Sequence, residues 1–178
     1  MDVTALLDRY AAGERNFRGV NLSAIDLKTA NLKGIMLQGA NLCAANLLEA
    51  DLTEADLSQA DLSQASLQKA DLTQANLEDA TLHKADIRAA KLHGTKLRGA
   101  DLTAVNLSSA DLRGADLRNV ILCGADLMYT NFHQANLCGA DLRGADLFQV
   151  HLKEAYFDES TQFDPGFNPA VLEMQRSS

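Results

Sequence analysis

The chain has 178 residues, 47% of them hydrophobic, and carries a formal net charge of −8. A single domain is expected at this length. The acidic balance disfavours binding to the phosphates of nucleic acids and favours a basic partner.

Residues 1–14 are predicted to form an N-terminal capping helix. Apolar residues recur there at helical spacing, namely Val3, Leu6, Leu7, Tyr10 and Ala11. Asp2 is a suitable N-cap and Gly13 can end the helix. The helix covers the end of the structure that follows or, in a second interpretation, docks on a partner. The segment has no basic stretch and no long apolar run, which predicts a cytoplasmic protein without a membrane span.

Residues 15–160 follow a five-residue period. Every fifth residue from Phe17 to Phe157 is Leu, Ile or Phe, and 25 of these 29 positions are Leu. We call this position the centre of its unit. The residue two before the centre is mostly Ala, and the residue between them is mostly Asp or Asn. Such spacing fits neither the period of a helix nor the alternation of a strand, so it predicts a solenoid of short extended segments joined by turns.

The repeated unit has a recognisable motif. Ala50–Glu54, Ala60–Gln64 and Ala140–Gly144 each read Ala-Asp-Leu followed by two variable residues. This motif resembles the pentapeptide-repeat family, in the form found in cyanobacteria. The resemblance implies an all-β fold, a right-handed quadrilateral β-helix with four units per coil and short α-helical caps. At four units per coil, the 29 units make about seven coils.

Residues 161–178 are predicted to be a C-terminal cap. The period slips by one residue after Phe157, because Gln162 stands where a centre belongs and Phe163 follows it. Asp164-Pro165-Gly166 predicts a turn, and Asn168-Pro169 predicts the start of a short helix. The aromatic residues of this end either cover the last coil or form a contact between two copies, which gives a monomer or an end-to-end dimer. They are Phe157, Phe163 and Phe167.

The sequence offers no candidate for catalysis, for a cofactor or for a metal. No nucleotide-binding glycine loop, zinc-type spacing or serine nucleophile motif occurs. The outward positions hold all four histidines and the cysteines Cys43, Cys123 and Cys138. Cys123 and Cys138 are expected on neighbouring sides of adjacent coils, so their pairing stays open, as does a redox role of the cysteines. We expect a protein that is not an enzyme.

Two groups of outward residues are candidates for binding a partner. The first is apolar, on one predicted side of the rod, and consists of Leu48, Met128, Tyr129 and Phe148. The second is an acidic band, made of Glu49, Asp51, Glu54, Asp56 and Asp61. Scattered surface apolarity explains the first group equally well, and a run of charges is usually a solvated face.

The preferred function is a non-catalytic structural or protein-interaction solenoid that presents rigid flat faces to a protein partner, without direct binding of nucleic acid or membrane. The resemblance implies one alternative, since some pentapeptide-repeat proteins mimic duplex DNA and bind a type II topoisomerase such as DNA gyrase. Duplex DNA carries about one charge per 1.7 Å, or about 20 over a rod of about 35 Å. A net charge of −8 is a poor copy of that density.

Overall fold

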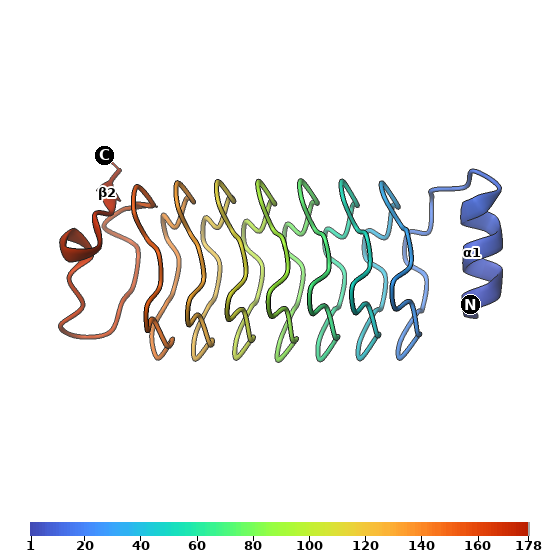
Figure 1. The fold of residues 1–178 in the computed structure, drawn as a ribbon, viewed down its shortest axis with the longest axis horizontal. Coiled ribbons are helices and arrows are strands. Elements are labelled where there is room, and N and C mark those ends of the chain that lie inside the picture. Colours follow the sequence, from blue (N-terminus) through green and yellow to red (C-terminus); the bar gives the residue numbers. More distant parts are fainter. Residues whose placement is uncertain (178) are drawn as a thin grey trace.

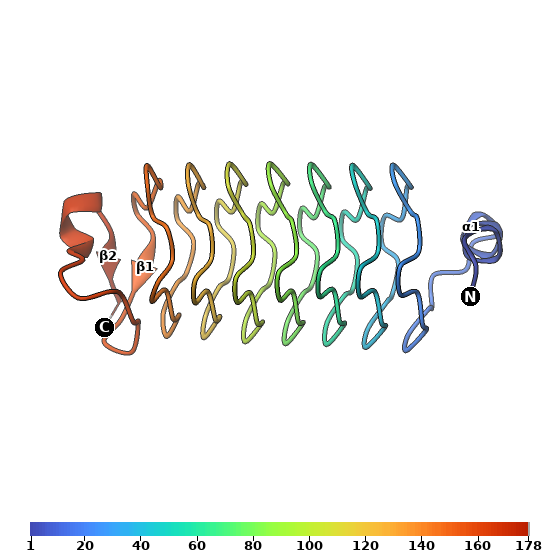
Figure 2. The ribbon, with the colours of Figure 1, turned by 90° about the horizontal axis from the view of Figure 1, so that it is seen from below.

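The computed structural model describes residues 1–177 and shows a straight rod (Figure 1). Helix α1 (Val3–Ala11) lies across one end of the rod. At the other end are strand β1 (Tyr156–Phe157), the short 3₁₀ helix η1 (Pro169–Leu172) and strand β2 (Gln175–Arg176). Between the two ends, the chain winds in regularly stacked coils, which Figure 2 shows from below.

The coils are held together by a continuous parallel ladder. Bridges join residues 20 positions apart, from Asn16↔Met36 to Asn136↔Tyr156, so each coil contains four five-residue units. Around Leu52, for example, the N–H of Leu52 donates to the carbonyl oxygen of Asp71 at 2.8 Å, and the N–H of Asp71 donates to Ala50 at 2.9 Å. The four sides of the rod follow from this stacking. We name each side by its last centre: Phe157, Leu142, Leu147 and Leu152.

Each unit ends in a tight turn that its polar residues make possible. In the unit of Leu52, the N–H of Ala55 donates to the carbonyl of Leu52 at 3.0 Å and closes a β-turn. Glu54 has a φ of 60°, the positive value that a type II turn requires at its second central residue. The side chain of Asp51 accepts from the N–H of Thr53 at 2.9 Å. The Asp and Asn columns therefore serve the turns, because this side-chain bond fixes the backbone at each corner.

The interior of the rod is filled by the centres and by the small residues two before them. Nearly all centres are completely buried, as are Thr95 and Thr130, which replace Ala. Their hydroxyls donate to the carbonyl oxygens of Leu72 at 2.9 Å and Leu107 at 2.8 Å. Within residues 1–177, no buried side-chain polar atom lacks a hydrogen-bond partner. The polar groups of the interior are therefore all satisfied by the protein itself.

Helix α1 closes the N-terminal end with the features that the sequence predicts. The carboxylate of Asp2 accepts from the N–H of Ala5 at 2.8 Å, and Leu6 is completely buried against the rod. The Tyr10 hydroxyl donates to the carbonyl oxygen of Lys33 at 2.8 Å, where the ladder would otherwise end without a partner. Gly13, with a φ of 96°, turns the chain from the helix into the first coil.

The C-terminal end differs from the prediction in two respects. The ladder continues beyond residue 160, because Gln162 pairs with Asp141 and β2 pairs in parallel with β1. The one-residue slip is absorbed by a turn at Asp158, whose side chain accepts from the N–H groups of Ser160 and Thr161. The terminal helix is a 3₁₀ helix rather than an α-helix, since only four residues separate its N-cap from a left-handed residue, Glu173.

Candidate functional site

The strongest candidate for a binding surface is an aromatic patch on the Leu147 side, next to the C-terminal end. It consists of Met128, Tyr129 and Phe148. Tyr129 is 50% exposed and Phe148 is 55% exposed, whereas Met128 is half-buried. The rings of Tyr129 and Phe148 meet edge to face, with their centroids 5.9 Å apart. Aromatic side chains that are exposed and already ordered by each other are typical of binding hot spots.

The ladder itself positions this patch. Met128 and Phe148 follow their centres in consecutive coils, so they are stacked neighbours in one column. Tyr129 occupies the left-handed corner of its unit, with a φ of 59°, and its N–H donates to the carbonyl oxygen of Phe148 at 3.1 Å. The paired backbone therefore fixes the positions of the two residues that carry the rings.

Leu48 lies on the same side of the rod, as predicted, but outside the aromatic patch. It lies in the same column as Met128 but four coils away, a distance of about 19 Å at the usual spacing of paired strands. Three polar residues, Gln68, Arg88 and Ser108, stand between them in the column. Leu48 is also half-buried rather than exposed.

The acidic band does not form one surface. Its residues come from consecutive units, so they lie on all four sides of the rod in turn. Glu54 is paired with Lys33 at 3.1 Å, and Glu49 is paired with Lys69 at 3.3 Å. Asp51 and Asp61 use their side chains to cap turns. A single flat partner cannot contact the whole band, and much of its charge is already neutralised.

A recurring ion pair within single units reduces the free negative charge further. The pattern is Asp before the centre and Arg after it, and it occurs at Asp86/Arg88, Asp111/Arg113, Asp116/Arg118 and Asp141/Arg143. Hydrogen bonds from the Arg143 guanidinium hold the pKa of the Asp141 carboxyl far below its usual range. These pairs were not predicted, although the repeated Asp-Leu-Arg and Asp-Ile-Arg pattern is visible in the sequence.

The C-terminal aromatic residues pack on one another and on the core. Phe163 stacks on Phe167 with centroids 4.4 Å apart, and meets Phe157 at 6.3 Å in an edge-on contact. All three rings are partly buried against the core of the rod. This arrangement covers part of the last coil.

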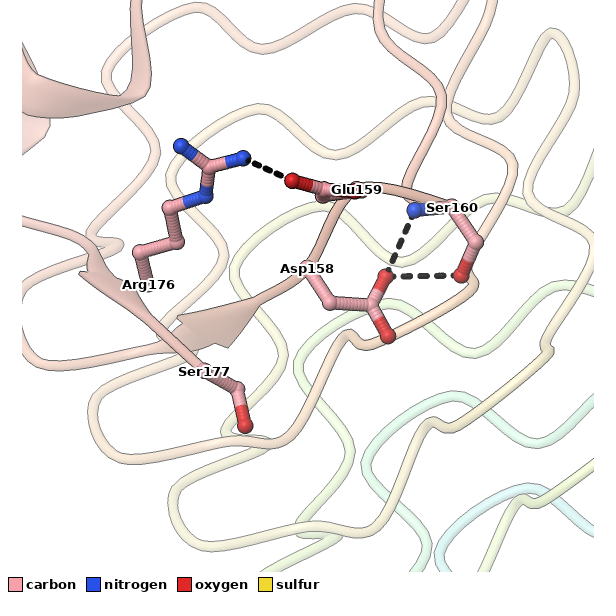
Figure 3. A pocket seen from close by; sticks show the side chains of 5 residues that line it. All are labelled: Asp158, Glu159, Ser160, Arg176 and Ser177. Carbon is pink, nitrogen blue, oxygen red and sulfur yellow. Dashed lines mark hydrogen bonds and ion pairs between the residues drawn. The ribbon is translucent and has the colours of Figure 1, made fainter.

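A hollow of 580 Å³ lies between the turn after β1 and the C-terminal strand (Figure 3). Its charged side chains form an ion pair with each other or accept hydrogen bonds from the turn. Arg176 is paired with Glu159 at 2.7 Å, and Asp158 accepts from the Ser160 hydroxyl at 2.7 Å. The hydroxyl of Ser160 and other donors to Asp158 lower the pKa of that carboxyl. Asp158 is therefore suited to holding the turn, and is a poor general base.

The cysteines are free and partly buried. Burial raises the pKa of the thiols of Cys123 and Cys138. A raised pKa disfavours the thiolate, which is the reactive form. Within residues 1–177, no three His, Cys, Asp or Glu side chains are grouped so that they could hold a metal ion. No helix in the same part of the chain is long and apolar enough to cross a membrane.

Comparison with known proteins identifies the repeat. A family model described as Pentapeptide repeats matches eight copies within residues 25–161. The crystal structure of HetL, a pentapeptide-repeat protein involved in heterocyst differentiation regulation from the cyanobacterium Nostoc sp. strain PCC 7120, is similar at 33% identity. The alignment has a TM-score of 0.65 and covers 90% of this chain and 79% of HetL.

A second solved structure is a trypsin-treated variant of QnrB1, a plasmid-mediated fluoroquinolone resistance protein. It aligns with 17% identity and a TM-score of 0.55, over 92% of this chain and 87% of QnrB1, and so shows likeness of fold. No curated protein sequence matches the chain. The motif, the coil spacing and these matches agree: the chain belongs to the pentapeptide-repeat family and folds as its right-handed β-helix.

Proposed function

We propose that the protein is a non-catalytic interaction protein that binds a protein partner through the aromatic patch. One observation carries the proposal: Tyr129 and Phe148 are both about half exposed and in contact with each other, on a rod whose interior is filled. A rigid solenoid loses little conformational entropy when such a surface is covered. The role of HetL in regulating differentiation supports a regulatory rather than a chemical role for this chain.

Affinity capture from a cell lysate tests the proposal with three forms of the chain. A Phe148→Glu variant places a charge in the aromatic patch. An Ile121→Glu variant is the matched control, because Ile121 is a similarly exposed apolar residue on the Leu142 side. We expect a protein that is retained by the wild type and by Ile121→Glu and lost with Phe148→Glu. Identical captured proteins for all three forms would remove the aromatic patch as the binding surface.

Mimicry of duplex DNA is a second candidate function, favoured by the straight rod and by the likeness of fold to QnrB1. The charges argue against it, because ion pairs neutralise much of the acidic band. Supercoiling by purified DNA gyrase, titrated with the protein, separates the two candidates. We expect no inhibition at micromolar protein. Inhibition that disappears when Glu54 and Asp56 are changed to Lys would instead support mimicry.

A further inference from the structure

The last coil of the rod is paired on two of its sides, in part on the Leu152 side, and least on the Leu147 side. The Phe157 side pairs with β2, and the Leu142 side pairs with Gln162. On the Leu152 side, the N–H of Glu154 donates to the carbonyl oxygen of Glu173 at 3.0 Å, and Leu152 is buried although its own N–H has no partner within residues 1–177. On the Leu147 side, the N–H groups of Leu147 and Gln149 and the carbonyl of Ala145 have no hydrogen-bond partner within residues 1–177. We call residues 145–149 the open rung.

One coil earlier, the same three groups are all paired. The N–H of Leu127 donates to Asp146 at 3.0 Å, the N–H of Tyr129 donates to Phe148 at 3.1 Å, and the carbonyl of Ala125 accepts from Asp146 at 2.9 Å. The burial of the centre differs between the same two coils. Leu127 is completely buried, whereas Leu147 is the one Leu centre in the described part of the chain that stays partly exposed.

The open rung has a local cause in the sequence. The N–H of Gly144 is held by the carboxylate of Asp164 at 2.9 Å, so the chain does reach the edge of the Leu147 side. Gly166, with a φ of 91°, then turns the chain away, and the N–H of Phe167 donates to the carbonyl oxygen of Asp164 at 3.1 Å instead of to the ladder. The next rung is therefore not built from this chain.

We infer that the open rung binds an extended segment of the partner protein, which adds one more strand to the ladder in parallel register. The inference rests on the proposed function and specifies its binding mode. The ladder dictates what the segment looks like: a small residue opposite Ala145 and, two residues later, an apolar side chain that covers Leu147. The exposed rings of Tyr129 and Phe148 lie directly beside this edge and contact the same segment.

A second copy of the chain is a poorer occupant. A parallel ladder has two different edges, so the open rung needs the N-terminal edge of another rod. That edge is tied to helix α1, since the N-terminal amine donates to the carbonyl oxygen of Asn21 at 3.3 Å and Tyr10 donates to Lys33. Stacking of two rods would require α1 to be displaced.

The experiment uses the full chain and a peptide with the sequence of residues 61–71. This peptide carries the unit Ala65–Lys69, which forms the rung on the same side of an inner coil. Amide hydrogen exchange by NMR should slow at Leu147 and Gln149 when the peptide is added, and stay unchanged at Leu127 and Tyr129. A peptide with Leu67→Asp should bind at least about tenfold more weakly, because its apolar side chain no longer covers Leu147.

A charged side chain that points inward at the edge of the ladder should prevent another strand from pairing with the open rung. Ala145→Lys is expected to abolish peptide binding, whereas Ala30→Lys, at a partly buried inward position of the first coil, should leave it intact. Unchanged exchange at Leu147 and Gln149 at millimolar peptide would overturn the inference, as would protection that appears without peptide as the protein is concentrated. In either case, capture that remains sensitive to Phe148→Glu would leave the proposed function standing.

Discussion

The two ends of the rod cover the exposed core and the edge of the ladder in different ways. At the N-terminal end, α1 lies across the ladder and buries Leu6 against the first coil. At the C-terminal end, the chain continues the ladder on some sides and covers part of the remainder with the stacked rings of Phe163 and Phe167. A transverse helix covers the core whatever the phase of the repeat. A continued ladder covers only those sides on which the chain, after its one-residue slip, pairs again with the preceding coil. It therefore leaves the open rung unpaired.

The largest expected effect is at the N-terminal end. Leu6→Ala removes the buried side chain that seals the first coil, and should lower the free energy of unfolding by about 2 to 5 kcal/mol. Urea unfolding measures the loss, and amide exchange should show it concentrated in the first coil, because coils in a solenoid contact only their neighbours. Leu7→Ala, at a partly buried position on the same helix, is the control and should cost less. Equal losses for the two variants would mean that Leu6 has no special role in the seal.

At the C-terminal end, Phe163→Ala should cost about 2 kcal/mol, because the ring is only partly buried but loses contacts with both Phe157 and Phe167. Amide exchange should then accelerate at β1 and leave the first coil unchanged. Acceleration at both ends would contradict the independence of the two caps.

A smaller effect is expected from the cap of α1. Asp2→Ala removes the side-chain acceptor of the Ala5 N–H and should lower the stability by about 1 kcal/mol. Asp8→Ala removes the same charge from an exposed position further along the helix and serves as the control. The thermal midpoints of the two variants give the comparison. A cap effect requires the Asp2 variant to melt at the lower temperature.

The sequence predicts the regular part of this molecule well, and its C-terminal end less well. Each unit repeats the same local rule, so the centres, the turns and the capping role of Asp2 follow from residue type and spacing. The slip at Gln162 is also visible, but whether the chain rejoins the ladder depends on how the Asp158 turn absorbs one extra residue. The aromatic patch is predictable only in part. Column position places Met128 beside Phe148, whereas the exclusion of Leu48 depends on counting the coils between them.

The smallest expected effect is a difference between the two ends in acid. At the C-terminal end, hydrogen bonds from the Ser160 hydroxyl and from the Gly139 N–H lower the pKa of Asp158. Because the pKa is lower in the folded state, the carboxylate contributes its full stabilisation above the ordinary Asp pKa of about 3.9, and this contribution is lost as the pH falls through the lower folded value. At the N-terminal end, hydrogen bonding to Arg9 lowers the pKa of Glu14, but this pair is exposed to solvent and contributes little.

Amide exchange followed from pH 7 to pH 2, corrected for its intrinsic pH dependence, should therefore show the Gly139 amide losing protection below about pH 4. Amides of the first coil should stay protected at the same pH. An Asp158→Asn variant keeps the shape of the side chain but cannot lose a charge, so its Gly139 protection should be lower at pH 7 and nearly independent of pH. If wild type and variant lose protection in parallel, the acid sensitivity of this end arises from another group, and the turn at Asp158 is held by its geometry rather than by its charge.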